Sequence, residues 1–189
     1  MKFTRTEIPD VIIIQPDVFG DARGYFMETF NAKKLRDFLG FNIDWCQDNE
    51  SKSSFGVLRG LHYQLPPFAQ TKLVRVIEGR VLDIAVDIRK GSHTFGKHVS
   101  VELTGDNKTQ VLVPKGFAHG FLVLSDTATF AYKVDNYYSP EHERGIMYND
   151  EDLGVDWQLP DSDLKLSERD AQQKAFAVAD YFDMRGTQF

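Results

Sequence analysis

The stretch Val81-Leu-Asp-Ile-Ala-Val-Asp-Ile-Arg89 decides the fold class. Its even-numbered residues are all large and aliphatic, whereas Asp83, Ala85, Asp87 and Arg89 between them are small or polar. Successive side chains of a β-strand point to opposite faces, so this alternation predicts a strand with one buried face. A helix would instead need its aliphatic residues three or four positions apart.

Similar short runs lie on both sides of this strand, at residues 11–14, 25–30, 73–77, 98–103, 110–113, 121–124 and 127–134. Turn sequences separate them, namely Gly20-Asp21, Gly79, Gly91-Ser92, Gly105-Asp106-Asn107 and Pro114-Lys115-Gly116. Many short strands at close intervals predict a mainly β protein, either a sandwich or a jelly-roll barrel.

Helices have a minor place in this pattern. One is well signalled, since Asn31 can cap its start, Leu35 and Leu39 belong to an apolar stripe, and Gly40 can end it. A second, weaker helix is expected to open near Ser167. The predicted fold is therefore mainly β with a few short helices.

The composition fits one globular domain spanning residues 1–189. Of these residues, 42% are hydrophobic and 26% are charged, which argues against extensive disorder. The net charge is −6, and no block of Lys and Arg is present. A protein that binds nucleic-acid backbones needs clustered basic residues, so we expect no nucleic-acid partner.

The environment of the chain follows from its single cysteine and its short apolar runs. Cys46 has no partner for an intrachain disulfide, which is compatible with a reducing compartment. The apolar run near the N-terminus, residues 11–14, is too short for a signal-peptide core or a membrane span. We therefore expect a cytoplasmic protein without a membrane partner.

Two histidines stand in positions where barrels of this kind often bind a metal ion. His62 lies in His62-Tyr63-Gln64, with no second histidine, and His119 ends Pro114-Lys-Gly-Phe-Ala-His119, with Val123 where an Asn would complete the set. Without carboxylate partners, two imidazoles make a poor site for iron or zinc, so we predict no metal.

A metal-free His62 can act as a general base, because the ordinary pKa of imidazole, about 6.5, suits proton transfer near neutrality. Arg59 and Lys72 place positive charge close to it in the sequence, and Tyr132 belongs to a strand expected to form another wall of the barrel. Each residue also has a plain structural interpretation: a histidine bonded to backbone, solvated strand charges and a core aromatic.

A shared pocket requires an irregular strand. Arg59 and His62 are three positions apart, so a regular strand would point them to opposite faces. Gly60 between them is a natural position for a bulge, and we predict a disruption between residues 58 and 62.

Several motifs along the chain together resemble those of one protein family. They are Gly20-Asp-Ala-Arg-Gly-Tyr-Phe26, Gln47-Asp-Asn49, Leu58-Arg-Gly-Leu-His-Tyr-Gln64, Lys72-Leu-Val74, Pro114-Lys-Gly-Phe-Ala-His-Gly-Phe121, Asn149-Asp150 and Leu166-Ser-Glu-Arg-Asp170. Their order and spacing, over nearly the whole chain, resemble those of dTDP-4-dehydrorhamnose 3,5-epimerases. The resemblance implies a cupin-type jelly roll, a double-stranded β-helix, without metal or cofactor. It also implies a dTDP-4-keto-6-deoxyhexose substrate.

The resemblance further implies roles for individual residues. His62 corresponds to the base, Asp170 to the carboxylate that orients it, Tyr132 to the proton donor on the opposite face of the sugar, and Lys72 to the residue near the enolate oxygen. Further substrate-binding positions correspond to Arg23, Phe26, Glu28, Gln47, Asn49, Arg59, His119, Tyr138, Glu143 and Arg169, with Tyr138 stacking on thymine. Family members are homodimers whose N-terminal region completes the neighbouring subunit's site.

Four positions depart from the family pattern: Arg169 stands where Lys is usual, Glu50 where His is common, Tyr148 where Trp is common and Gln158 where Pro is common. None belongs to the acid–base set, so they bear on substrate detail rather than on reaction type. Arg169 keeps the charge of lysine but not its hydrogen-bond geometry.

Alternatives to the 3,5-epimerase remain open from sequence. A related enzyme could invert only C3 or only C5, and a binding module could have lost the proton-transfer pair. Ser167-Glu-Arg-Asp170 is also a helix-capping pattern, which is the plain interpretation of Asp170. Acyl transfer is excluded, because no Ser or Cys lies in a nucleophile motif near His62.

Overall fold

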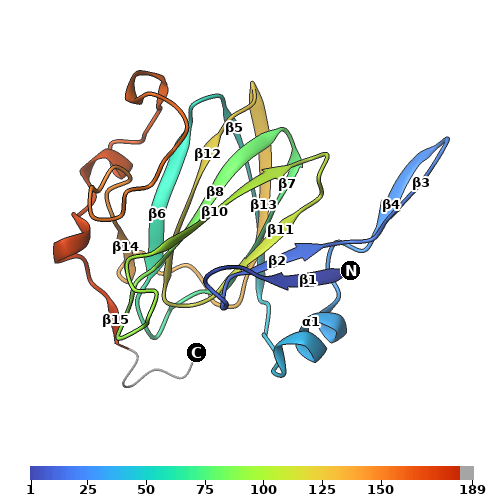
Figure 1. Cartoon of the computed structure of the whole chain (residues 1–189), viewed down its shortest axis with the longest axis horizontal. Coiled ribbons are helices and arrows are strands. Elements are labelled where there is room, and N and C mark those ends of the chain that lie inside the picture. Colours follow the sequence, from blue (N-terminus) through green and yellow to red (C-terminus); the bar gives the residue numbers. More distant parts are fainter. Residues whose placement is uncertain (184–189) are drawn as a thin grey trace.

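Two antiparallel sheets face each other in the computed structural model, which describes residues 1–183 (Figure 1). The first sheet has the strand order β1 (Lys2–Arg5), β2 (Ile12–Gln15), β11 (Gln110–Val113), β7 (Lys72–Glu78), β13 (Thr127–Val134) and β5 (Gln47–Ser54). The second has the order β10 (His98–Thr104), β8 (Arg80–Asp87), β12 (Phe117–Val123), β6 (Leu58–Gln64) and β14 (Glu143–Gly145). The mainly β, jelly-roll type of fold predicted from the sequence is confirmed.

The remaining elements lie at the edges of these sheets. They are the hairpin β3 (Val18–Asp21) and β4 (Gly24–Met27), helix α1 (Ala32–Leu39), the parallel pair β9 (Arg89–Lys90) and β15 (Phe182–Asp183), and the 3₁₀ turns η1 (Asp161–Asp163), η2 (Asp170–Gln172) and η3 (Phe176–Val178). Helix α1 begins after Asn31, whose side chain accepts from the Lys34 N–H, and ends at Gly40, as predicted. In residues 1–183 it is the only α-helix, and its eight residues are too few to cross a membrane.

Strand β8 is buried on both faces, so the expectation of one exposed face was wrong. On one face it packs Leu82, Ile84 and Val86, together with Ile88 just beyond its end, under the C-terminal segment, against Trp157, Phe176 and Phe182 among others. Its other face points between the sheets, where Val81 and Ala85 join an interior cluster and Asp83 is 1% exposed. The aliphatic face of β8 is therefore covered by the C-terminal segment. The face that carries Asp83 points into the barrel interior.

Strand β6 carries the predicted irregularity. His62 lies opposite His119 and Arg59 opposite Phe121, so β6 has one more residue than β12 between these pairs. Gly60 in this bulge has φ +133°, and a Cβ there would lie 2.5 Å from the Cα of Gly120. Only glycine fits such a close approach with this backbone conformation.

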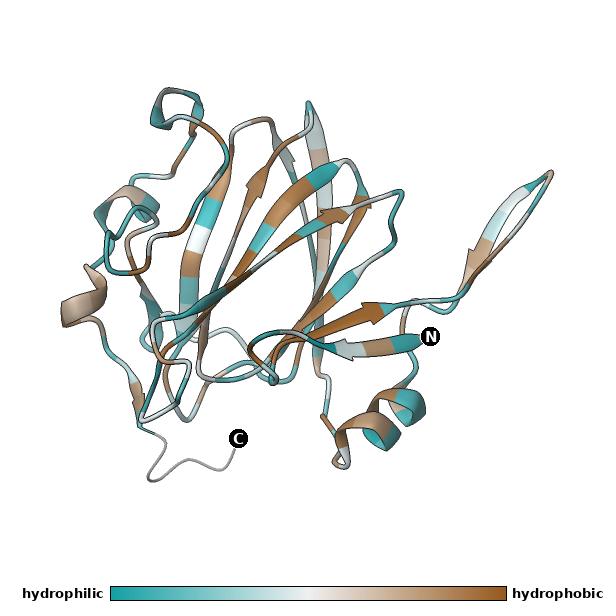
Figure 2. Cartoon of the chain, in the orientation of Figure 1, coloured by the Kyte–Doolittle hydropathy of each residue, from teal (hydrophilic) through white to brown (hydrophobic). Residues whose placement is uncertain are grey.

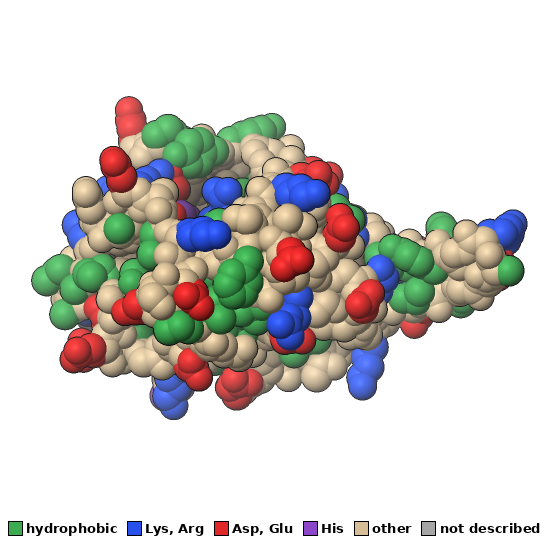
Figure 3. All heavy atoms as spheres, turned by 90° about the horizontal axis from the view of Figure 1, so that it is seen from above, with side chains coloured by type: hydrophobic (Ala, Val, Ile, Leu, Met, Phe, Trp, Pro, Cys, Tyr) green, Lys and Arg blue, Asp and Glu red, His purple; other side chains and the backbone are tan. Residues whose placement is uncertain are grey.

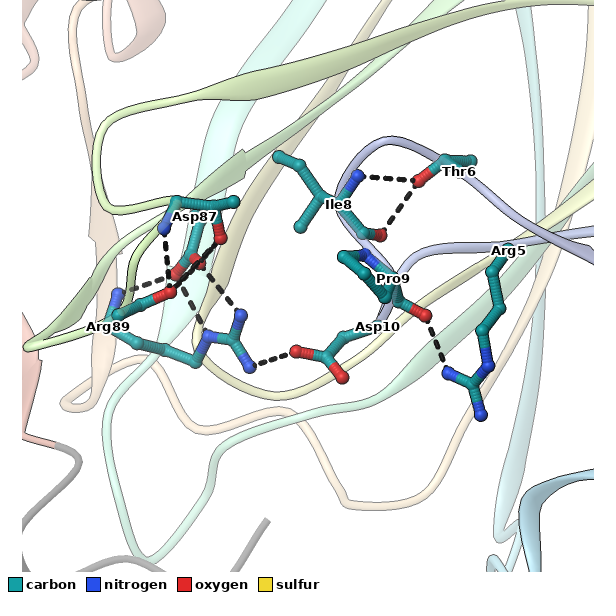
Figure 4. A network of polar contacts seen from close by, with 9 residues as sticks. Arg5, Thr6, Ile8, Pro9, Asp10, Asp87 and Arg89 are labelled. Atoms are coloured by element: carbon teal, nitrogen blue, oxygen red, sulfur yellow. Dashed lines mark hydrogen bonds and ion pairs between the residues drawn. The ribbon is translucent and has the colours of Figure 1, made fainter.

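An ion-pair network links the N-terminal strands to the second sheet through buried Asp87 and Arg89 and half-exposed Asp10 (Figure 4). Asp87 accepts hydrogen bonds from Nε and Nη2 of Arg89 at 2.9 and 2.7 Å, and Arg89 Nη1 donates to Asp10 at 2.7 Å. Asp10 belongs to the turn between β1 and the apolar strand β2 (Figure 2). The contact therefore ties the β1–β2 turn to the end of β8.

Several elements differ from the sequence prediction. β12 begins at Phe117 rather than at residue 121, and β4 ends at Met27 rather than at residue 30. β1, β3 and β5 have no counterpart among the predicted runs. The helix expected near Ser167 is only the 3₁₀ turn η2. The Ser167 capping pattern is nevertheless present, because its Oγ accepts from the Asp170 N–H at 3.1 Å.

Candidate active site

A cavity of about 290 Å³ opens between the two sheets. It is lined by Asn49, Glu50, Ser51, Arg59, His62, Lys72, His119, Phe121, Phe130, Tyr132 and Asp170. The structure thus brings together all four predicted catalytic residues. Phe121 and Phe130 stack with ring centroids 4.1 Å apart and give this polar cavity an aromatic wall.

Strand register explains why distant residues meet in the cavity. Tyr132 on β13 lies directly opposite Asn49 on β5 and Val74 on β7. Because alternate residues share a face, Lys72 and Ser51 point to the same side of this sheet as Tyr132. His62 and His119 come from neighbouring strands of the opposite sheet. The imidazole of His62 and the phenol of Tyr132 therefore belong to opposing walls.

His62 is paired with Asp170. Its Nε2 lies 2.5 Å from Oδ1 of Asp170, whose residue is 5% exposed. Burial by itself would raise the pKa of Asp170, but the hydrogen bond and charge of His62 outweigh it, and the net pKa is below the ordinary value. Asp170 is thus held in its turn by its N–H, which donates to Ser167 Oγ, and it holds the imidazole through its side chain.

His119 forms a second pair that sequence reasoning missed. Its Nε2 lies 2.9 Å from Oδ2 of Asp83, and both side chains are buried. The prediction of an imidazole without a carboxylate partner was therefore wrong for His119, whereas His62 has the partner, Asp170, that the family resemblance implies. The alternation in β8 carried the signal, since it places Asp83 on the face opposite the aliphatic stripe.

Lys72 and Arg59 supply the positive charge of the cavity. Burial lowers the pKa of Lys72 to about 8, against the opposing effect of the Glu143 and Asp83 carboxylates. Its ammonium makes no hydrogen bond or ion pair to any residue that the structure describes. The Arg59 guanidinium donates to Ser53 Oγ from Nε at 3.3 Å and from Nη2 at 3.2 Å.

Tyr132 presents a phenol without a hydrogen-bond partner among residues 1–183. Burial raises the pKa of this phenol, with a further upward contribution from Glu143 and a downward one from Arg59. Its ring packs against Phe130, with centroids 6.2 Å apart. The interpretation of Tyr132 as a core aromatic bonded to backbone does not fit, because the residue lines the cavity and its hydroxyl bonds to no backbone group of residues 1–183.

Four further predicted residues lie near the cavity without lining it. Gln47 donates to Asn49 Oδ1 at 2.6 Å, which orients both side chains. Glu143 joins the other two, since it accepts from the Tyr138 hydroxyl and lies 2.7 Å from Nη2 of Arg169. Arg169 directly precedes Asp170 in the sequence, so this cluster adjoins the His62 pair.

Three predicted binding residues lie elsewhere. Arg23 and Phe26 belong to the β3–β4 hairpin, an arm that projects from the barrel (Figures 1 and 3). Arg23 pairs with Asp21 inside that arm at 2.5 Å. Glu28 accepts from Asn31 and Lys34 at the start of α1, both at 2.8 Å. Their own chain does not bring these residues into the cavity.

The residue types in the cavity bear on metal binding. Within residues 1–183, no group of three or more His, Cys, Asp and Glu side chains could hold a metal ion. His62 and His119 lie opposite each other on β6 and β12, but each is engaged by its own carboxylate. The set is arranged as two histidine–carboxylate pairs.

Comparison with known proteins identifies the family. The family model described as dTDP-4-dehydrorhamnose 3,5-epimerase matches residues 5–178. A dTDP-4-dehydrorhamnose 3,5-epimerase of Shigella flexneri is 54% identical over 96% of this chain and 99% of its own length.

Solved structures agree with the sequence matches. The dTDP-4-dehydrorhamnose 3,5-epimerase of Elizabethkingia anophelis NUHP1 is 53% identical, with a TM-score of 0.90 over 94% of this chain and 97% of that one. A dTDP-6-deoxy-D-glucose-3,5-epimerase of Legionella pneumophila Philadelphia 1, in complex with dTDP-4-keto-L-rhamnose, is 50% identical, with a TM-score of 0.91 over 95% and 94%. These similarities confirm the family and the epimerase activity predicted from the sequence. The chain belongs to the dTDP-4-dehydrorhamnose 3,5-epimerase family.

Proposed function

We propose that the cavity between the sheets epimerises C3 and C5 of dTDP-4-dehydro-6-deoxy-D-glucose, giving dTDP-4-dehydro-L-rhamnose, with His62 as base and Tyr132 as acid. One observation carries the assignment: an imidazole fixed by Asp170 and a phenol with no hydrogen-bond partner in the described part of the chain line one cavity from opposing sheets. Both carbons flank the C4 ketone, so removal of either hydrogen gives an enolate. Inversion then requires that a proton return from the other face.

His62 is arranged for proton abstraction. Its Nε2 is engaged by Asp170, which leaves Nδ1 as the nitrogen that accepts a proton. The buried carboxylate then stabilises the imidazolium that forms and keeps the ring in one orientation. Tyr132 is arranged for the reverse step, because its raised pKa keeps the phenol protonated at neutral pH.

Lys72 is assigned to the enolate oxygen. Proton transfer by itself leaves the developing negative charge at O4 uncompensated, and one preorganised donor at such an oxygen is worth about 3–4 kcal/mol. The Lys72 ammonium lines the cavity and has no hydrogen-bond partner among the described residues. We assign binding of the nucleotide and diphosphate to Arg59, His119, Gln47 and Asn49. We assign binding of the thymine end to the cluster of Tyr138, Glu143 and Arg169.

The lowered pKa of Lys72 predicts a pH dependence. We expect kcat to fall as pH rises through about 8, because the ammonium loses its proton. Stability should move the other way: between pH 8 and 10.5 the unfolded chain binds more protons at this lysine, so its contribution to the free energy of unfolding rises with pH. In Lys72→Arg the charge persists, and the alkaline fall near pH 8 should disappear. The same fall in that variant would exclude Lys72 as its origin.

Incubation in deuterated water tests the reaction. The 3,5-epimerase incorporates solvent deuterium at both C3 and C5 of the dTDP-4-keto-6-deoxy sugar and inverts both centres, as mass spectrometry and NMR would show. Exchange at one carbon alone would identify an enzyme that inverts only C3 or only C5. No exchange at either carbon would identify a binding module and contradict the proposal.

The assembly we propose is a homodimer in which the β3–β4 arm completes the partner's site. On the arm, Phe19 and Phe26 are 66% and 68% exposed, an apolar surface that a lone chain leaves in water. The arm carries Arg23, which the chain's own cavity does not use. Strand β5, which carries Asn49, lies at one edge of its sheet, so a partner's arm has a strand edge to meet beside the cavity.

Mixing two inactive variants tests this assembly. We expect a chain with both Arg23→Ala and Phe26→Ala, and a chain with His62→Ala, each to be inactive alone. After subunit exchange, about a quarter of wild-type activity should return, because half of the dimers are mixed and each mixed dimer holds one complete site. Full activity of the arm variant by itself would exclude a role for the arm in the site.

A further inference from the structure

Ser167 holds the Asp170 carboxylate from the side opposite His62. Its Oγ donates to Oδ2 of Asp170 at 2.8 Å, while His62 lies 2.5 Å from Oδ1. The two carboxylate oxygens therefore have one fixed partner each. The same Oγ accepts from the Asp170 N–H at 3.1 Å, so one hydroxyl acts on the backbone and on the side chain of the same residue.

The turn that carries Ser167 is itself fixed to the strand of the base. Lys165 donates its N–H to Gly56 O at 2.7 Å and accepts from the Leu58 N–H at 3.0 Å, at the start of β6. The N–H of Ala171 donates to Ser167 O at 3.0 Å and closes the turn. The backbone thus sets where Asp170 lies, whereas the Ser167 hydroxyl sets how its carboxylate is turned.

We propose that Ser167 is a positioning residue for the epimerisation: its hydroxyl fixes the Asp170 carboxylate so that His62 keeps Nδ1 free as the base. This inference rests on the proposed function of His62. The titratable and charged groups that face the carboxylate are His62 from β6 and Arg169 from the adjoining turn. Ser167 is the neutral donor among its partners, so its loss leaves one oxygen unsatisfied and makes the carboxylate more basic.

Three substitutions separate this role from simple capping. Ser167→Thr keeps both hydrogen bonds. Ser167→Ala removes both. Ser167→Asp keeps a good cap for the turn but cannot donate to the carboxylate. We expect the Ser167→Thr variant to retain wild-type kcat. In the Ser167→Ala and Ser167→Asp variants, kcat should fall by about 10- to 100-fold with KM unchanged. In Ala and Asp the acid limb of the pH–rate profile should move to higher pH, since a more basic carboxylate favours the imidazolium.

A control variant and two further outcomes test whether Ser167 has this positioning role. Ser162→Ala removes a comparable serine-to-carboxylate contact, to Asp163, at an exposed turn and should leave kcat and the pH profile unchanged. Ser167→Asp with wild-type kcat and profile would overturn the proposal and leave only a cap. If Ser167→Ala fails to fold, the Asp variant still decides. Retained deuterium exchange in His62→Ala would instead overturn the proposed function, whatever the Ser167 variants do.

Discussion

The His62→Ala chain should lose deuterium exchange at both C3 and C5, with kcat lowered by about 10²–10⁴-fold, the range that one positioned proton-transfer group supplies. Both carbons lose exchange together because one imidazole serves both abstractions, and His62 is the base held by a buried carboxylate on its wall of the cavity. Exchange measured by mass spectrometry in deuterated water reports abstraction directly, whether or not the centre is inverted.

The fold of this variant is checked against a surface histidine. His98→Ala, on the edge strand β10, changes the same residue type away from the cavity and should leave exchange unchanged. Equal circular-dichroism spectra of the two variants would attribute the loss to the missing base. Exchange at either carbon at the wild-type rate would exclude His62 as the base for that carbon.

The Tyr132→Phe chain should lose inversion while keeping most deuterium uptake. His62 still abstracts the proton, but without the phenol the enolate is reprotonated from the face of the base, which restores the original configuration with deuterium in place. The rate of inversion should fall by about 10²–10⁴-fold. NMR of the sugar separates inversion from exchange, because it reads configuration and isotope content at each carbon.

Stability should change little in this variant. The phenylalanine ring keeps the packing against Phe130, and the hydroxyl has no hydrogen-bond partner within residues 1–183 that its removal would leave unsatisfied. Tyr137→Phe changes an exposed phenol that does not line the cavity, so this variant serves as the control and should be fully active. Equal loss of uptake and inversion in Tyr132→Phe would mean that another group is the donor.

Sequence periodicity predicted the strands whose buried face is apolar. It did not predict a strand whose buried face carries polar residues of the site. Strand β5 was missed because Asn49 and Ser51 point into the cavity, so no hydrophobic alternation marks it. Strand β8 was recognised, but its polar face was assigned to solvent. Local pattern could not show that the C-terminal segment returns to cover the aliphatic face.

Sequence motifs predicted part of the site. Contacts between side chains that only the fold brings together could not be predicted. The bulge at Gly60 followed from the parity of Arg59 and His62 alone. Asp83 could not be joined to His119, because their contact arises from strand register between β8 and β12. The projection of Arg23 on an arm likewise depends on how the hairpin leaves the barrel, which no local pattern contains.

The base and the carboxylate that orients it are 108 residues apart in the sequence. Every strand of the two main sheets has been synthesised by Gly145, but Asp170 has not. At roughly 5–20 residues per second, a nascent chain therefore waits on the order of ten seconds between emergence of the imidazole and arrival of its partner. A chain halted before Asp170 lacks both the carboxylate that orients His62 and the C-terminal residues that cover β8, so turnover should report completion of the polypeptide.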